Sequence, residues 1–353
     1  MNAHQWWARG AVATYAFLIA LTWGFEKNGA HAAQRFQKAE FREFTPRAEK
    51  RGTSSKSSRA QATYQKIGRT QGGYALEYGF KNFNGDVLSI RTELGADVVA
   101  ASIQEFGFRQ EEFDKLDLWY KNARKFAFAE TSRVLKSRKF KSQAEADEAS
   151  RLSQRSLDRE MDLLAKAYRK KRLKIYEDAG FRMADENTIE ADVPGMVRRN
   201  WKRMRPLARS FSQISADKRY EAEDLIGAVT AMVQTSMRYE IPDKQEGTRT
   251  IGGILPPLKA LVLGQGDCDT KTAVLSSILM NWPNIKMVGL GIPGHYLMAF
   301  HQIPRRGDIF IEYKGLQYVM IESAGPAWLR PGTVGDSTYA YLKSGKNFRI
   351  QPM

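Results

Sequence analysis

Apolar and polar residues alternate with a period of two along two short stretches on either side of residue 84, which is typical of β-strands with one buried face. Asn84-Gly85 lies between the stretches and supplies the residue types that a tight hairpin turn prefers. The alternating apolar residues are Tyr74, Leu76, Tyr78 and Phe80 before the turn and Leu88, Ile90 and Leu94 after it. The pattern therefore predicts a β-hairpin.

From about Ala96 to Gly180 the apolar residues recur every three or four positions, which predicts helices, and Gly180 is a reasonable helix stop. We expect a helical hairpin whose basic faces are solvated. An alternative is that the basic runs at 169–172 and 198–199 form a surface for an anionic partner. A further short helix is expected over residues 197–211.

The last third of the chain reads as a mixture of helices and antiparallel strands. Apolar residues at helical spacing predict an amphipathic helix from Tyr220 to Tyr239, ended by Pro242. A Gly- and Pro-rich loop follows, and a second helix is expected to begin at Cys268. Strands are then predicted at Ile285–Gly291, His295–Phe300, Asp308–Tyr313 and Gln317–Ile321. The last third is therefore expected to contain two helices followed by four strands.

Cys268 is the single cysteine of the chain, and glycines lead into the helix that it begins. The thiolate is the reactive form of cysteine, and the unpaired backbone N–H groups at a helix start stabilise negative charge. The same N–H groups can bind the oxyanion that forms when a thiolate attacks an amide. We therefore expect Cys268 to be a nucleophile.

His295 begins the predicted strand that follows the turn Pro293-Gly294, so its imidazole can face the start of the cysteine helix and act as general base. A third group must orient the imidazole. Glu322, at the end of the last predicted strand, is the candidate for that role, and Asp308 is the alternative. Asp267 and Asp269 are expected to cap the helix or hold the loop.

Four short motifs in this order resemble the bacterial transglutaminase-like cysteine peptidase superfamily. They are Val233-Gln234 to Tyr239-Glu240-Ile241-Pro242, Gly266-Asp267-Cys268-Asp269, Gly294-His295-Tyr296 and Tyr318-Val319-Met320-Ile321-Glu322-Ser323. The resemblance covers about the last third of the chain. It implies a papain-like α+β fold with Cys268 as nucleophile, His295 as general base and Glu322 as the acid.

The chain has 353 residues, with 55 Lys and Arg against 39 Asp and Glu, so its formal net charge is +16. Such a surface favours polyanionic partners, among them an anionic envelope surface or an acidic protein. No nucleic-acid-binding motif is found, so nucleic acid is not an expected partner. One cysteine excludes an internal disulfide and a zinc site built on paired cysteines, and no metal or cofactor is expected.

The N-terminus has the layout of a secretory signal, with Arg9 before an apolar run from Gly10 to Phe25 and Ala30-His31-Ala32 before a possible cleavage site. We expect a signal peptide or membrane anchor over 1–32, a basic flexible linker over 33–71, the hairpin and helical region over 72–215 and the catalytic domain over 216–353. The expected location is the periplasm or outside the cell, with an inner-membrane anchor as the alternative.

These expectations combine into an exported thiol enzyme that acts on amide bonds of proteins or peptides through an acyl-enzyme. Hydrolysis is favoured over transamidation because bacterial members of the superfamily that the chain resembles are mostly hydrolytic. The alternative is a non-catalytic envelope scaffold, or a membrane-tethered adaptor, that keeps the fold without turnover.

Overall fold

The structure, a computed structural model, describes residues 40–43, 63–185 and 188–353, which lie within one compact unit from Ala39 to Met353. The expected signal peptide or anchor at 1–32 and much of the expected linker lie outside the described residues. Among the residues that are described, no helix is both long and apolar enough to span a bilayer.

The predicted β-hairpin is confirmed as β3 (Gly73–Lys81) and β4 (Val87–Gly95), which pair antiparallel. A third strand, β2 (Tyr64–Arg69), pairs with the outer edge of β3. The Tyr64 hydroxyl donates to Glu77 Oε1 across the pair at 2.6 Å. The prediction of a flexible linker up to residue 71 is therefore wrong for this part, because backbone pairing and the Tyr64 contact order it.

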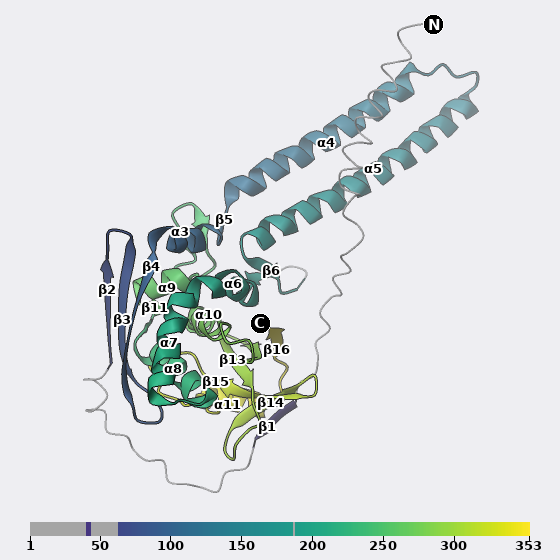
Figure 1. The fold of residues 1–353 in the computed structure, drawn as a ribbon. Coiled ribbons are helices and arrows are strands. Elements are labelled where there is room, and N and C mark those ends of the chain that lie inside the picture. Colours follow the sequence, from purple (N-terminus) through teal and green to yellow (C-terminus); the bar gives the residue numbers. More distant parts are fainter. Residues whose placement is uncertain (1–39, 44–62, 186–187) are drawn as a thin grey trace. The chain divides into compact units, whose positions relative to one another are not determined.

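The predicted helical hairpin is confirmed as two long helices that run side by side, α4 (Gln110–Ser137) and α5 (Gln143–Asp178), shown in Figure 1. They follow α3 (Ala96–Gln104) and the short strand β5 (Phe108–Arg109). Rings of Phe108, Phe113, Tyr176 and Phe181 contact one another where the hairpin leaves the core. This aromatic cluster joins the hairpin to the remainder of the unit.

The helices that follow pack around the one that carries Cys268. They are α6 (Val193–Asn200), the 3-10 turn η1 (Trp201–Met204), α7 (Arg205–Lys218), α8 (Ala222–Thr235), α9 (Pro257–Leu263) and α10 (Cys268–Leu279). Short two-stranded or three-stranded pairings connect them through β6 (Phe181–Met183), β7 (Ile189–Ala191), β9 (Gln245–Glu246) and β10 (Arg249–Thr250).

The predicted helix from Tyr220 to Tyr239 is shorter than expected, because α8 ends at Thr235. Arg238–Tyr239 instead forms β8, which pairs in parallel with β11 (Gln265–Gly266). The backbone N–H of Arg238 donates to the Gly264 carbonyl at 2.9 Å. Long-range pairing thus overrides the helical pattern at this end. It places Tyr239 beside Gly266, which lies two residues before Cys268.

The C-terminal sheet has the strand order β1-β14-β15-β13-β12-β16, and all its pairings are antiparallel. Its strands are β1 (Glu40–Glu43), β12 (Met287–Ile292), β13 (His295–His301), β14 (Ile309–Tyr313), β15 (Leu316–Ile321) and β16 (Arg349–Pro352). β1 also falls inside the segment that was predicted to be a linker. The four predicted strands between residues 285 and 321 are confirmed, and the fold is α+β.

The two faces of this sheet bury different apolar clusters. Tyr296, Met298 and Phe300 of β13 join the main core, against which α10 packs, whereas Leu297 and Ala299 face a second cluster. α11 (Asp336–Lys343) contributes Leu342 to that second cluster. Alternate residues of one strand are therefore buried on both sides, as a covered sheet requires.

The main core also crosses the predicted domain boundary between residues 215 and 216. Leu207 and Phe211 of α7 belong to the same cluster as Met232 of α8 and Tyr78 of β3. Packing is continuous there, so the N-terminal sheet and helices help to hold the elements that carry Cys268.

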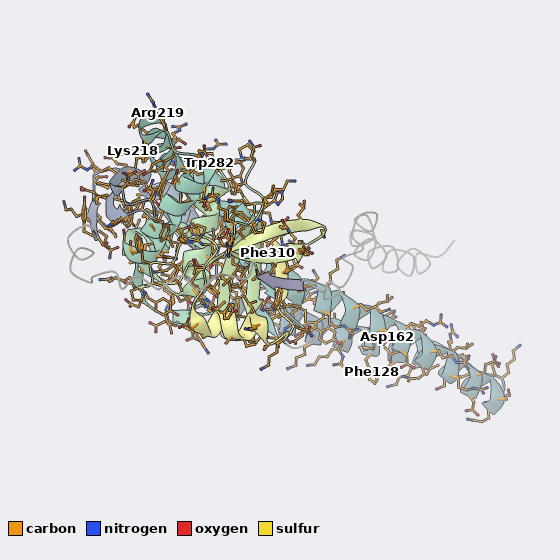
Figure 2. The ribbon with its side chains drawn as sticks, turned by 90° about the horizontal axis from the view of Figure 1, so that it is seen from below. Phe128, Asp162, Lys218, Arg219, Trp282 and Phe310 are labelled. Carbon is orange, nitrogen blue, oxygen red and sulfur yellow. The ribbon has the colours of Figure 1, made fainter. Side chains whose placement is uncertain are left out.

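Phe113→Ala is predicted to lower the free energy of unfolding by about 3 kcal/mol, since a buried ring is lost from the aromatic cluster. Phe113 is 6% exposed and its ring centroid lies 4.8 Å from that of Tyr176. The control is Phe128→Ala on the same helix, because Phe128, labelled in Figure 2, is 61% exposed. Denaturant unfolding followed by circular dichroism measures both, and equal losses would contradict the assignment of the cluster.

Candidate active site

Cys268 occupies the first position of α10, and Asp267 caps this helix by accepting a hydrogen bond from the Thr270 amide at 3.0 Å. The expectation that Cys268 begins a helix and that Asp267 caps it is confirmed. Cys268 is 7% exposed. The backbone N–H groups at the start of α10 therefore lie next to a nearly buried thiol.

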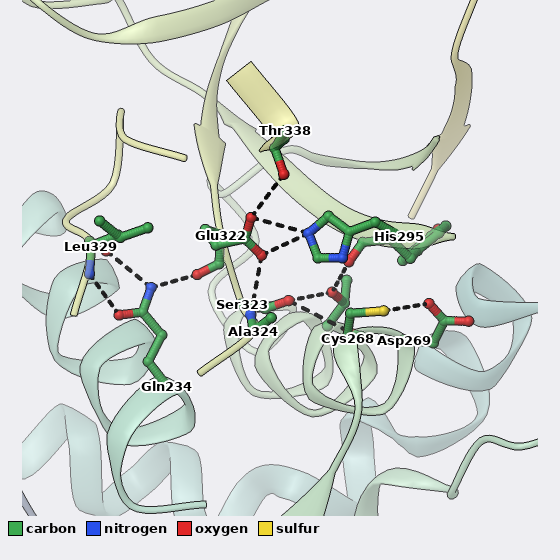
Figure 3. Close-up of polar contacts among 11 residues, drawn as sticks. Gln234, Cys268, Asp269, His295, Glu322, Ser323, Ala324, Leu329 and Thr338 are labelled. Carbon is green, nitrogen blue, oxygen red and sulfur yellow. Dashed lines mark hydrogen bonds and ion pairs between the residues drawn. The ribbon is translucent and has the colours of Figure 1, made fainter. Parts of the chain in front are cut away.

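The Cys268 thiol donates to Asp269 Oδ1 at 3.3 Å, and Figure 3 shows the sulfur turned toward that carboxylate. Burial raises the pKa of Cys268, and the charges of Asp269 and Asp267 raise it further. A hydrogen bond from the Tyr296 backbone amide works in the opposite direction without reversing the shift. The raised pKa and the hydrogen bond to Asp269 keep the thiol protonated near neutral pH, and within the described residues no hydrogen bond joins Cys268 to His295.

His295 and Glu322 are in direct contact. The imidazole Nε2 lies 2.9 Å from Glu322 Oε1 and 3.0 Å from Oε2, as Figure 3 shows. Burial by itself lowers the pKa of His295, but the hydrogen bond and charge of Glu322, with the charges of Asp269 and Asp267, raise it overall. Because Nε2 faces Glu322, Nδ1 is the ring nitrogen left to exchange a proton with another group.

Glu322 is held by contacts from several elements. Its carboxylate accepts from Thr338 Oγ1 of α11 and from the Ala324 amide, each at 3.3 Å. Gln234 of α8 donates through Nε2 to the carbonyl oxygens of Glu322 and Leu329. The Gln234 amide is therefore committed to fixing the segment after β15.

Asp308, the alternative acid, lies in a different network. Its carboxylate accepts from Arg330 Nη1 and from the Arg305 amide, each at 2.8 Å. Of the two candidates, the structure brings Glu322 to His295. His301 lies at the other end of the strand that His295 begins, and its Nδ1 donates to the Gln317 carbonyl oxygen at 2.9 Å.

Cys268 and His295 line one cavity of about 310 Å³. Its walls come from the start of α10, β12, the start of β13, β7 and β16. Segments that are distant in sequence thus enclose the thiol and the imidazole, and the space is large enough for a few side-chain atoms of a ligand.

Several residues of the site carry no sequence signal of their role. Lys271 is completely buried, and its Nζ donates to the Met237 carbonyl at 2.7 Å and the Gln234 carbonyl at 3.4 Å. Burial lowers the pKa of Lys271 to about 8. Glu190 and Gln351 line the cavity from β7 and β16. Only the position of Asp269 next to Cys268 could have suggested its contact with the thiol.

Within the part of the chain that the structure describes, no group of three or more His, Cys, Asp or Glu side chains is placed to hold a metal ion together.

Glu322→Gln is predicted to lower the pKa of His295, because the variant removes the charge that holds the proton on the ring. In the native protein the raised pKa makes protonation of His295 stabilising below its unfolded value of about 6.5, and that stability is lost as pH rises through the folded pKa. NMR titration of the His295 ring measures the shift. Asp308→Asn is the control, and an equal effect of both variants would contradict the pairing with Glu322.

Comparison with known proteins yields no relative: no family model, no curated protein and no solved structure matches this chain. The function is therefore argued from the contacts around Cys268, His295 and Glu322.

Proposed function

We propose that the chain is a thiol enzyme that breaks or transfers amide bonds of proteins or peptides, with a papain-like arrangement of the transglutaminase-like type. The single observation that carries the proposal is the contact of His295 Nε2 with both Glu322 oxygens, beside a cavity that also contains Cys268. A carboxylate that fixes one ring nitrogen leaves the other available as a general base.

In the proposed reaction, Nδ1 of His295 takes the Cys268 proton, and the sulfur attacks the carbonyl carbon of the substrate amide. The N–H groups at the start of α10 stabilise the resulting oxyanion. The protonated imidazole then gives its proton to the departing amine as the C–N bond breaks, which leaves a thioester. Water or a second amine attacks this thioester through the same base, so the products are an acid or a new amide.

The thiol must first leave Asp269. Rotation about the Cα–Cβ bond of Cys268 carries the sulfur away from the carboxylate, and the positive charge that develops on His295 then favours the thiolate. We assign the observed conformation to the resting enzyme, in which the thiol is protonated and weakly reactive.

Hydrolysis is the proposed outcome, with transfer to an amine as the variant reaction, because the resemblance is to a largely hydrolytic superfamily. Export to the periplasm or the cell exterior is part of the proposal and is supported by the residue pattern at 1–32, with a membrane anchor as the alternative. The excess of basic residues supports contact with an anionic envelope surface or partner protein.

A non-catalytic scaffold is the second candidate, and one observation favours it. Burial and two neighbouring carboxylates raise the pKa of Cys268, and the thiol donates to Asp269. A cysteine that stayed in this state would be inert.

The rate of Cys268 alkylation by iodoacetamide separates the two candidates. For the enzyme, we expect reaction below pH 7 and a loss of about tenfold or more in His295→Ala, since the imidazole no longer removes the proton. Mass spectrometry of the intact chain measures the rate directly, because Cys268 is the only cysteine.

His301→Ala is the matched control, because this histidine lies on the same strand and contacts Gln317. It should leave the rate unchanged. If the native chain and His295→Ala both react only near pH 8.5, as an ordinary thiol does, the enzyme proposal fails and the scaffold takes its place.

A further inference from the structure

The cavity beside Cys268 carries three carboxylates, and their surroundings differ. Glu190 is neutralised by two guanidinium groups, with Arg182 Nη2 at 2.6 Å and Arg349 Nη1 at 2.6 Å. The Asp267 carboxylate caps α10 by accepting a hydrogen bond from the Thr270 amide. Asp269 forms no salt bridge within the described residues, and its hydrogen bond is with the Cys268 thiol.

Asp269 is therefore a carboxylate in a confined space that forms no salt bridge, and the imidazole of His295 is the positive group that acts on it through its charge. Burial, followed by the charge of Asp267, raises the pKa of Asp269 to about 6, so it is mostly ionised at neutral pH and at a cost in free energy. A cation that enters the cavity would offset this cost.

Gln351 supplies an independent indication of a ligand. It is 3% exposed and lines the same cavity, and its Oε1 accepts from the Tyr296 hydroxyl at 2.7 Å. No acceptor within the described residues takes a hydrogen bond from its amide nitrogen. This nitrogen is not among the fully enclosed polar atoms without a partner, so it can be reached from the cavity that Gln351 lines, and a ligand carbonyl oxygen there would accept from it.

We propose that this cavity binds the amine-bearing part of the substrate's acyl group, with Asp269 as counter-ion to a protonated amine and Gln351 as donor to a carbonyl oxygen. The substrate class is then a peptide with a lysine-like residue next to the amide that Cys268 attacks. This proposal rests on the proposed function, because it assigns the amine to a substrate of Cys268.

The same contact explains how the resting thiol is released. An ammonium group at Asp269 competes with the thiol for that carboxylate and cancels the negative charge that opposes a thiolate. The sulfur is then free to turn toward His295. Asp269 is thus a specificity-determining residue, and binding of the correct substrate also activates the nucleophile.

The net charge of the whole chain and the carboxylates of the cavity favour ligands of opposite sign, so their effects can be told apart. At +16, the protein as a whole attracts anions. A preference of Cys268 for cations must therefore come from the local carboxylates.

The test compares two methanethiosulfonate reagents of similar length on the full chain, one with a trimethylammonium group and one with a sulfonate. In each case the Cys268 sulfur forms a disulfide with the reagent's sulfenyl group and methanesulfinate leaves. We expect the cationic reagent to react about tenfold faster, relative to the same ratio for a free small thiol. Asp269→Asn should bring the ratio close to that of the free thiol.

Asp217→Asn is the matched control, because it makes the same change in net charge on an exposed site of α7. It should leave the ratio as in the native chain. A native ratio equal to that of the free thiol, no effect of Asp269→Asn, or no reaction with either reagent would each overturn the proposal.

The outcome is distinguishable from that of the proposed function, because reagent selectivity needs no turnover. Matched peptides with lysine or norleucine before the scissile amide then test the substrate class. Acyl-enzyme that forms equally well from both peptides would leave the enzyme proposal standing and remove the amine assignment. If the thiol prefers the cationic reagent but the chain forms no acyl-enzyme, the cation preference of the cavity stands and the enzyme proposal fails.

Discussion

The burial of α10 on all sides is the constraint on which the site depends. All its residues except Asp269 are buried, so neighbouring elements provide most of the hydrogen bonds of its polar side chains, although Ser277 Oγ has no partner among the described residues. Lys271 donates to the carbonyl of Met237 after α8, Thr272 Oγ1 meets Ser323 Oγ at 2.5 Å, and the Leu255 amide donates to Thr270 Oγ1. The helix that carries the thiol is thereby tied to the residues that follow β15.

These ties join the packing of the core to the geometry of the chemistry. Gln234 of the buried α8 holds the backbone of Glu322, and the Glu322 carboxylate holds the ring of His295. A glycine at residue 325 is required next to this junction, because a Cβ there would lie 1.9 Å from the Gln234 carbonyl oxygen. The position of the His295 ring is thus fixed by hydrogen bonds within the core and not by a surface loop.

The electrostatics of the site oppose the nucleophile in its resting conformation. The carboxylates at residues 267 and 269 raise the pKa of the thiol and also that of the imidazole. A protonated thiol beside a base that holds its own proton is weakly reactive, and only the fraction of molecules in which the sulfur turns to His295 reacts until the local charge changes. Our proposals identify that change as the arrival of a cationic substrate, which links recognition to activation in one cavity.

Local pattern was sufficient to predict the hairpin at 73–95, the helix that begins at Cys268 and the strands from Met287 to Ile321, because period and turn residues act over a few positions. Sequence reasoning also named Glu322 as the candidate partner of His295, with Asp308 as the alternative, and the tertiary structure brings Glu322 to the imidazole. Only the tertiary structure decided that α8 ends early, that β2 joins the first sheet, and that Asp269 accepts a hydrogen bond from the Cys268 thiol. It also decided that Lys271 is buried and that Gln351 reaches the cavity. These features depend on pairing and burial between segments far apart in the chain, and hydrophobic period carries no information about such partners.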